Sequence, residues 1–202
     1  MNTPRKIEPP LSRSSLSFLL VDGNEFMRSL IKRGVKPYAR EIREAANGAE
    51  ALRMMQKFSP DIILVDWEME PVNGLDFVKR VRDPKDSPFP YSRIIMVSAM
   101  AERQRVLTAW GAGIDEFLVK PVSITDLLGR VRRVIENPRP FIRVKMYCGP
   151  DRRRPRLPYD GPERRSEIQQ AQQLSQEEVN ALMNPPRDDA DRPMQEARAE
   201  AG

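Results

Sequence analysis

The sequence predicts an α/β fold in which five parallel strands alternate with five helices, a (βα)5 arrangement, over residues 16–137. Short apolar runs alternate with amphipathic stretches five times in this range, which is the pattern of a parallel sheet covered by helices on both faces. The third and fourth runs are apolar almost throughout, as expected of strands that are buried on both sides. Helix-capping residues stand between the runs, so that local and global signals agree.

The five expected strands lie at residues 17–22, 41–45, 62–66, 94–98 and 116–119. The helices between them are predicted from apolar residues spaced three and four apart, because such residues share one face of a helix. These residues are Phe26, Met27, Leu30 and Ile31; Ala51, Leu52 and Met55; Leu75, Val78 and Val81; and Ile124, Leu127, Leu128, Val131 and Ile135. The fourth helix, at residues 101–110, has the least regular pattern.

The expected helix ends carry matching signals. Asn47 and Gly48 precede the second helix, Gly111 and Gly113 follow the fourth, and Ser123 is placed to cap the fifth. The punctuation therefore supports the same five-helix scheme as the apolar pattern.

We expect one domain with an extension on either side. Residues 1–15 are predicted to form a disordered arm, 16–137 the (βα)5 domain, 138–170 a connector rich in proline and arginine, 171–186 a short amphipathic helix, and 187–202 a disordered tail. The extension after the domain is thus expected to be largely disordered. Residues 137–167 hold nine basic and four acidic side chains, so the connector is strongly basic.

The composition excludes several classes of activity. The chain has no histidine, which excludes serine–histidine and cysteine–histidine catalysis and any role as the phosphohistidine donor of a relay. Its single cysteine cannot form an internal disulfide, and the apolar run at residues 16–21 is too short for a signal sequence or a membrane span. We therefore expect a cytoplasmic protein without membrane insertion.

Polar side chains stand where four of the predicted strands end. Asp22 ends the first strand, Asp66 the third and Ser98 the fourth, and Lys120 follows the fifth. Ligands of open parallel sheets bind at this carboxyl edge, so the four side chains are expected to converge. A carboxylate can attack an activated phosphoryl group when a divalent cation and a lysine offset the repulsion between anions. The combination therefore predicts phosphoryl transfer to Asp66, although each residue alone has an ordinary structural explanation.

Five stretches resemble the consecutive signature blocks of response regulator receiver domains, and of chemotaxis-type regulators in particular. They are FLLVDGNEFMRSL, AANGAEAL, PDIILVDWEMEPVNGLDF, RIIMVSAM and GIDEFLVKP. The resemblance implies a flavodoxin-like, doubly wound sheet with strand order 2-1-3-4-5 and a role in two-component phosphorelay signalling, with chemotaxis or flagellar motility as one setting. The implied partners are a histidine kinase or histidine phosphotransfer protein as donor, and another receiver or a flagellar or chemotaxis protein downstream.

The resemblance also assigns roles within the pocket. Asp66 is implied as the phosphoacceptor, Ser98 as the hydroxyl switch residue, Lys120 as the charge partner, and Phe117 as the aromatic residue that changes rotamer on activation. The implied cofactor is Mg²⁺, and its ligands would be Asp22, Asp66 and the backbone carbonyl of Glu68.

Departures from the family pattern concern the metal site. Receivers carry two adjacent acids after the first strand, whereas here Asp22 is followed by Gly23, and the missing acid is the family's direct magnesium ligand. Its loss is expected to weaken binding, because few protein carboxylates hold Mg²⁺. Glu68 either supplies a compensating carboxylate or repels an incoming phosphoryl group. The loop after Asp66 is expected to differ in shape, because its proline comes one position later and an asparagine replaces the usual acid.

Two hypotheses follow for the domain. We favour a working phosphoreceiver with altered metal affinity, because Asp66, Ser98 and Lys120 are all present. The alternative is a degenerate receiver that acts as a phosphorylation-independent docking module. A DNA-binding regulator that uses the basic connector ranks below both, since no recognition helix accompanies the arginines. Nucleic-acid binding is therefore not expected. An enzyme with its own substrate is not expected either, because the sequence shows no second set of catalytic residues outside the pocket.

The connector contains the pattern Tyr-x-Gly-Pro-acid-Arg-Arg twice, at residues 147–153 and 159–165. Gly-Pro favours a turn, and paired arginines can bind carboxylates or phosphates. The pattern indicates either a repetitive linker or a motif that docks on a surface such as the receiver itself.

Residues 174–184 predict a compact helix. Ser175 and Glu178 form a capping box, and an apolar residue on each side of the box forms a hydrophobic staple. The segment is similar to the N-terminal peptide of the flagellar motor switch protein, which binds the phosphorylated chemotaxis regulator. The predicted partner-binding residues are Leu174, Val179, Leu182 and Met183.

Such a short helix needs a groove that buries its apolar stripe. We expect it to dock on the face made by the fourth helix, the fifth strand and the fifth helix, either in the same molecule or in a second receiver. Phosphorylation of Asp66 would bias docking through Ser98 and Phe117.

Overall fold

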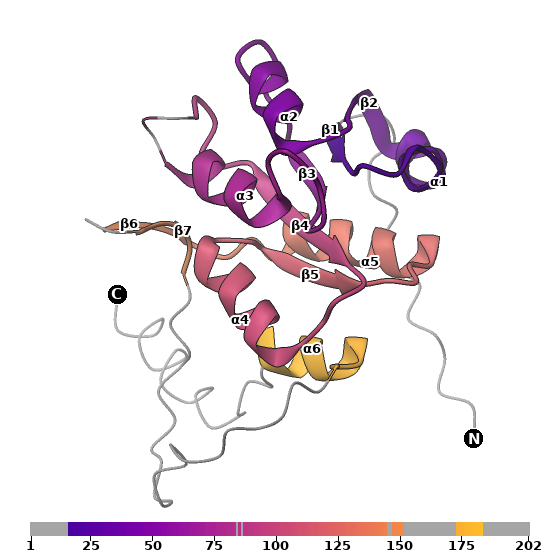
Figure 1. Cartoon of the computed structure of the whole chain (residues 1–202), viewed down its shortest axis with the longest axis vertical. Coiled ribbons are helices and arrows are strands. Elements are labelled where there is room, and N and C mark those ends of the chain that lie inside the picture. Colours follow the sequence, from indigo (N-terminus) through magenta and orange to yellow (C-terminus); the bar gives the residue numbers. More distant parts are fainter. Residues whose placement is uncertain (1–15, 84, 86, 145–146, 152–172, 184–202) are drawn as a thin grey trace, which may run out of the picture.

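The computed structural model of the chain describes residues 16–83, 85, 87–144, 147–151 and 173–183 (Figure 1). Its centre is a five-stranded parallel sheet in the order β2-β1-β3-β4-β5. The strands are β1 (Leu16–Val21), β2 (Ala39–Ala45), β3 (Ile62–Asp66), β4 (Arg93–Ser98) and β5 (Glu116–Val119). The predicted (βα)5 fold and strand order are confirmed.

Helices cover both faces of the sheet (Figure 1). On one face lie α1 (Glu25–Val35), followed by the 3-10 helix η1 (Lys36–Tyr38), and α5 (Ile124–Glu136). On the other lie α2 (Gly48–Met55), α3 (Gly74–Arg82) and α4 (Arg103–Ala112). All of β3 and all but the first residue of β4 are buried, which explains their apolar sequences.

Each face of the sheet has its own apolar core, because successive side chains of a strand point to opposite faces. Phe18 and Leu20 of β1 belong to the core beneath α1 and α5, whereas Leu19 and Val21 belong to the core beneath α2, α3 and α4. Phe26 differs from its predicted place on the buried face of α1, since it is 68% exposed in the first turn of that helix. The core contacts of α1 come from its later turns.

Polar side chains determine where four helices begin. Asn24, Asn47, Asn73 and Ser123 each accept a hydrogen bond from the backbone N–H three residues later, which satisfies a donor that the helix leaves unpaired. Gly113 follows α4 with a φ of 106°, a conformation that glycine adopts without strain. The capping roles predicted for Asn47, Gly113 and Ser123 are confirmed, whereas Gly111, expected after the fourth helix, lies within α4, and Gly48, expected before the second, is the first residue of α2.

A β-hairpin that was not expected from the sequence follows α5. Its strands, β6 (Phe141–Val144) and β7 (Tyr147–Pro150), pair antiparallel in the first part of the expected connector. Phe141 anchors the hairpin, because its ring lies 4.9 Å from the Arg82 guanidinium and 5.5 Å from that of Arg93. The folded region therefore continues past the expected boundary at residue 137 to Asp151.

The hairpin contains the first copy of the Tyr-x-Gly-Pro pattern. The Tyr147 hydroxyl donates to the Pro150 carbonyl at 2.8 Å, so the motif closes on itself. Gly149 lies against Gly113 at the end of α4, and β7 contacts α3. Residues 147–151 of this copy thus pack against the receiver, whereas its two arginines, at positions 152 and 153, and the whole second copy lie outside the described residues.

The terminal helix is α6 (Gln176–Met183). The predicted capping box is present, because the Glu178 N–H donates to Ser175 Oγ at 3.2 Å and the Ser175 N–H donates to Glu178 Oε2 at 2.8 Å. α6 packs against α4 and β5 of the same chain, and Figure 1 shows it beside α4. The expected arm at residues 1–15 and tail at 187–202 lie outside the described residues.

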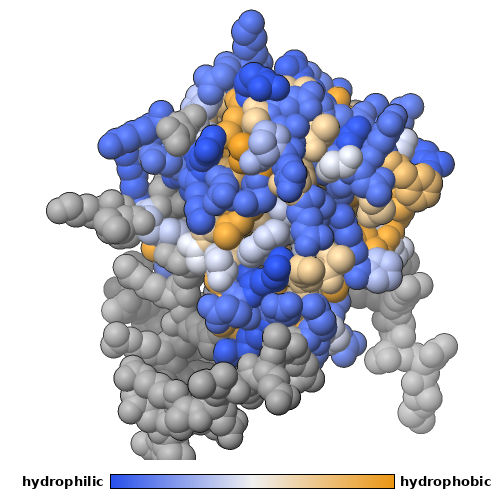
Figure 2. Space-filling view, viewed as in Figure 1, coloured by the Kyte–Doolittle hydropathy of each residue, from blue (hydrophilic) through white to orange (hydrophobic). Residues whose placement is uncertain are grey.

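The face of the molecule seen in Figure 2 is mainly hydrophilic, with small, separate hydrophobic patches. In the part of the chain that the structure describes, Phe26 and Tyr91 are the exposed large hydrophobic side chains. Across the same ranges, none of the helices has the length and apolar character needed to cross a bilayer.

A buried arginine ties α3 to the loops that precede β4 and β5. Arg82 is 3% exposed and donates to the carbonyls of Pro90, Ser92 and Gly113 at 2.5, 2.7 and 2.8 Å. Its Nη2 lies 3.0 Å from Asp115 Oδ2. Burial raises the pKa of Asp115, and the charge of Arg82 opposes that rise. Without the guanidinium, a buried carboxylate would lose its main counter-charge.

Replacing Arg82 by methionine is expected to lower the free energy of unfolding by about 3–5 kcal/mol, because it breaks a buried ion pair from one side. Urea denaturation followed by circular dichroism measures the change. Lys79→Met is the control, since Lys79 lies on the same helix with a side chain that is 57% exposed, and its loss should be below about 1 kcal/mol. Equal losses for both variants would contradict the role assigned to Arg82.

Candidate functional site

The four polar side chains predicted to converge lie at the carboxyl edge of the sheet. Asp22 follows β1, Asp66 ends β3, Ser98 ends β4 and Lys120 follows β5. These four strands are consecutive in the sheet, so that their ends are neighbours. Asp22, Asp66 and Ser98 are 4%, 9% and 0% exposed, which makes the pocket a poorly solvated one.

The ammonium group of Lys120 joins the two carboxylates. Its Nζ lies 3.1 Å from Asp22 Oδ2 and 3.2 Å from Asp66 Oδ1. The backbone N–H of Lys120 donates to the Ser98 carbonyl at 2.9 Å, which fixes the residue to the end of β4. The single positive charge of Lys120 thus faces the two carboxylates of Asp22 and Asp66. The three groups together keep a net negative charge that a cation can balance.

The electrostatic environment differs from that of surface acids. Burial raises the pKa of Asp66 above its ordinary value of 3.8; the charge of Lys120 opposes the rise and that of Asp22 adds to it. Burial alone would lower the pKa of Lys120, but the charges of Asp66 and Asp22 together exceed this effect and leave it raised. Asp66 is therefore a poorly solvated carboxylate beside a protonated lysine, which suits a nucleophile.

Ser98 and Phe117, the two residues to which the resemblance assigns switching roles, lie on neighbouring strands. The Ser98 Oγ accepts a hydrogen bond from the Met100 N–H at 3.1 Å, at the start of the loop between β4 and α4. Phe117 is 0% exposed and belongs to the same apolar cluster as Val106 of α4 and Val179 of α6. The pocket and the surface beneath α6 thus share the ends of β4 and β5.

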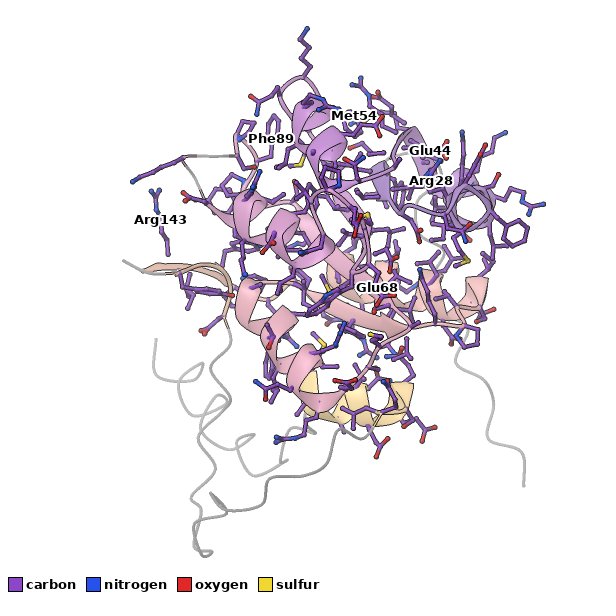
Figure 3. The ribbon with its side chains drawn as sticks, viewed as in Figure 1. Arg28, Glu44, Met54, Glu68, Phe89 and Arg143 are labelled. Atoms are coloured by element: carbon purple, nitrogen blue, oxygen red, sulfur yellow. The ribbon has the colours of Figure 1, made fainter. Side chains whose placement is uncertain are left out.

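The structure brings together the two carboxylates expected to bind magnesium, while the role of the Glu68 backbone carbonyl stays a prediction. Asp22 and Asp66 meet around Lys120, and two carboxylates fit an ion that is typically held by one or two of them together with water. Glu68 is exposed on the loop after β3 (Figure 3). Among the described residues, no three acidic, cysteine or histidine side chains form a metal-binding group, so the Glu68 carboxylate does not join the pair.

The position of the missing acid is open. A Cβ placed on Gly23 would meet one atom within 4 Å, the Ala46 carbonyl oxygen at 3.7 Å. The adjoining backbone is held by Arg28, whose Nη1 donates to the Asp22 carbonyl at 2.6 Å and whose Nε lies 3.8 Å from Glu44 (Figure 3). Space is therefore available for a side chain at Gly23.

The loop after Asp66 is held against the start of α3. The Gly74 N–H donates to the Trp67 carbonyl at 2.9 Å, and a Cβ on Gly74 would lie 1.9 Å from the Asp66 carbonyl oxygen. Glycine is required at this close approach. Asn73, which replaces the family's usual acid, caps α3. Arg105 of α4 lies over the Trp67 ring, 5.3 Å from its centroid, and lines a surface hollow together with Trp67 and Glu68.

Arg28 and Arg105 were not identified from the sequence. Both stand in the first turn of a helix that begins at the carboxyl edge of the sheet. That position was the available signal, because the first turn of a helix after a parallel strand faces the ligand edge. Their residue type alone does not distinguish them from surface arginines.

Comparison with known proteins defines the class. Residues 18–132, more than half of the chain, match the family model of the response regulator receiver domain. The chain therefore belongs to the response regulator receiver family.

The relatives include chemotaxis proteins of similar domain size. The chain is 37% identical over 114 residues to the chemotaxis protein CheY of Listeria monocytogenes. The aligned residues make up 56% of this chain and 92% of the Listeria protein. The solved structure of CheY4 from Vibrio cholerae has a TM-score of 0.55 and 28% identity, covering 60% of this chain and 99% of that one. These proteins match the receiver domain. The family match ends at residue 132, so the resemblance of residues 174–184 to the motor switch peptide stays a prediction.

A third comparison supports the fold alone, because its identity is low. It is the structure titled as a complex of CheX, CheY, BeF₃ and Mg²⁺ from Borrelia burgdorferi, with a TM-score of 0.54 and 24% identity, covering 60% of this chain and 90% of that one.

Replacing Lys120 by methionine is expected to raise the pKa of Asp66 further, because it removes the charge that opposes burial. Asp66 would then remain protonated to higher pH. As the pH is lowered, the rate of any reaction that needs the Asp66 carboxylate would therefore begin to fall at a higher pH than in the wild type. Carboxyl ¹³C NMR titration measures the pKa. Asp22→Asn should shift it the opposite way and Lys79→Met should leave it unchanged; an unchanged value in Lys120→Met would contradict the pairing.

Proposed function

We propose that the chain is a phosphoreceiver of two-component signalling in which Asp66 accepts a phosphoryl group from a histidine kinase or histidine phosphotransfer protein. The observation that carries the proposal is the Lys120 ammonium group, which lies within 3.2 Å of both Asp22 and Asp66 at the ligand edge of the sheet. The chain has no histidine of its own, so the phosphohistidine belongs to another molecule.

In the proposed reaction, a carboxylate oxygen of Asp66 forms a bond to phosphorus while the phosphorus–nitrogen bond of the donor breaks and the imidazole leaves with the electron pair. Lys120 offsets the repulsion between the carboxylate and the phosphoryl group, and the Ser98 hydroxyl donates to a phosphoryl oxygen. Mg²⁺ bound by Asp22, Asp66 and the Glu68 backbone carbonyl would supply further positive charge. The product is an acyl phosphate on Asp66.

The output that we propose is contact with another protein, in a cytoplasmic signalling pathway such as chemotaxis or flagellar motility. The similarity to chemotaxis proteins supports this setting. The packing of α6 on α4 and β5 supports that surface as the output face. A second receiver or a flagellar protein fits as the partner, since residues 174–184 resemble a peptide that binds such a receiver.

A degenerate receiver is the second candidate, and one observation favours it. Gly23 removes the family's direct magnesium ligand, and the exposed Glu68 carboxylate does not replace it. In that case the domain would dock to its partner without phosphorylation.

Incubation of the full chain with acetyl phosphate and Mg²⁺, followed by intact mass measurement, separates these candidates. A phosphoreceiver gains the mass of one phosphoryl group, and Asp66→Asn abolishes the gain because it removes the nucleophile. Asp83→Asn, which changes an exposed aspartate after α3, is the matched control and should react like the wild type. A folded wild-type protein that gains no mass would reject the phosphoreceiver.

Gly23→Asp is expected to strengthen Mg²⁺ binding several-fold, because it adds a carboxylate at an open position beside Asp22. Trp67 follows Asp66 directly, and in a Trp110→Phe background it is the only tryptophan of the chain, so its fluorescence serves as the readout. Gly129→Asp is the control, since a Cβ there meets no atom within 4 Å and the residue lies on α5. Equal affinities in wild type and Gly23→Asp would show that the missing acid does not limit binding.

A further inference from the structure

We infer that residues 173–183 are an internal ligand of the α4–β5 face, held there by two glutamine side chains that bind the backbone next to the phosphoryl pocket. The occupant of this face is thus a segment of the same chain. The docking of residues 173–183 is inferred from contacts within the structure. The coupling of this docking to phosphorylation of Asp66 rests on the proposed function.

Gln176 completes the open edge of the sheet. β5 is an edge strand, so one row of its backbone groups has no neighbouring strand. The Gln176 Oε1 accepts from the Val119 N–H at 2.6 Å, and its Nε2 donates to the Phe117 carbonyl at 3.0 Å. Its Nε2 also donates to Asn180 Oδ1 at 2.9 Å, which orients the amide. A primary amide carries a donor and an acceptor side by side and therefore imitates the peptide group of an added strand.

Gln173 binds the loop between β4 and α4 in a similar way. Its Oε1 accepts from the Ala101 N–H at 2.8 Å, and the Leu174 N–H donates to the Ala101 carbonyl at 2.9 Å. Gln173 also forms an isolated antiparallel bridge with Glu102. Both polar groups of the Ala101 backbone are thus paired with the tail.

Apolar burial holds the helix on the face. Val179 and Met183 are 0% and 2% exposed, and Leu174 and Leu182 are partly buried against the same cluster. These are the four residues that the sequence predicted to bind a partner. The conformational entropy lost when the segment becomes ordered opposes the free energy gained from burying these side chains. Because only two side chains are fully buried, the docking is expected to be reversible.

Arg139 closes the far end of the helix. Its Nη2 donates to the Met183 carbonyl at 2.6 Å, and its guanidinium lies over the Trp110 ring, 5.5 Å from the centroid. A cation is favourable at this end because the carbonyls there carry partial negative charge. The contact joins α6 to the segment after α5 as well as to α4.

The tail contacts adjoin the residues that would bind the phosphoryl group. Ala101 follows Ser98 by three residues, and Val119 directly precedes Lys120. A backbone shift at either residue on phosphorylation would alter the hydrogen bonds of a tail glutamine. Docking of the tail and occupancy of the pocket are therefore coupled, and the coupling acts equally in both directions.

The same contacts define a competing partner. A helix would need a glutamine in its first turn and apolar residues three and seven positions later, as in Gln176, Val179 and Met183. Such a helix binds this chain well only after α6 has left the face.

A labelled peptide of residues 170–186, added to the full chain, tests the occupancy. Val179→Asp should prevent the protein's own helix from docking, and the peptide should then bind at least about tenfold more tightly than to the wild type, because the competent state is no longer rare. Ala181→Asp places the same charge on an exposed position of α6 and should behave like the wild type. Equal binding to wild type and Val179→Asp, or binding to neither, would overturn the inference.

Two further arms test the glutamines and the link to Asp66. A peptide with Gln176→Ala should lose most of its affinity for the Val179→Asp chain; undiminished binding would overturn the role of the amide. Beryllofluoride with Mg²⁺ should change the affinity for the unmodified peptide by threefold or more. Trp67 fluorescence, measured in the Trp110→Phe background, reports separately whether beryllofluoride binds: no response rejects the proposed function, whereas a response without a change in peptide affinity rejects only the coupling.

Discussion

The contact of Lys120 with Asp22 and Asp66 is the interaction on which the rest of the structure depends. It exists because β1, β3 and β5 all run in one direction and end at one edge of the sheet. Burial disfavours the charged form of Asp66, and the charge of Lys120 offsets only part of that effect. The pocket is therefore suited to take up positive charge together with a phosphoryl anion, which is the chemistry that phosphoryl transfer requires.

The strands that build the pocket also carry the tail. β5 presents Lys120 to the pocket, and the Phe117 carbonyl and Val119 N–H to Gln176. The loop after β4 presents its backbone to the tail three residues after Ser98. A short backbone displacement thus reaches both surfaces, and no long chain of contacts is needed to connect them. Two described parts of the extension beyond residue 137, the hairpin and α6, pack against the receiver.

The parts of the structure that were predicted from the sequence have local signals. The apolar runs of β3 and β4, the capping side chains and the polar residues at strand ends are each visible within a few positions. The hairpin was missed because its place depends on Phe141 against Arg82, residues far apart in sequence that no periodicity connects. The apolar stripe of α6 was predicted, but Gln176 was not, since its role depends on an unpaired strand edge in another part of the fold.

The central claim is that the phosphoryl pocket and the docked tail form one coupled unit. The most direct test is an amide ¹H–¹⁵N NMR spectrum of the full chain, before and after saturation with beryllofluoride and Mg²⁺. The account predicts shifts around Asp66 and Ser98, continuing through Ala101 and Val119 into residues 173–183. Shifts around Asp66 that leave the signals of residues 173–183 unchanged would contradict it.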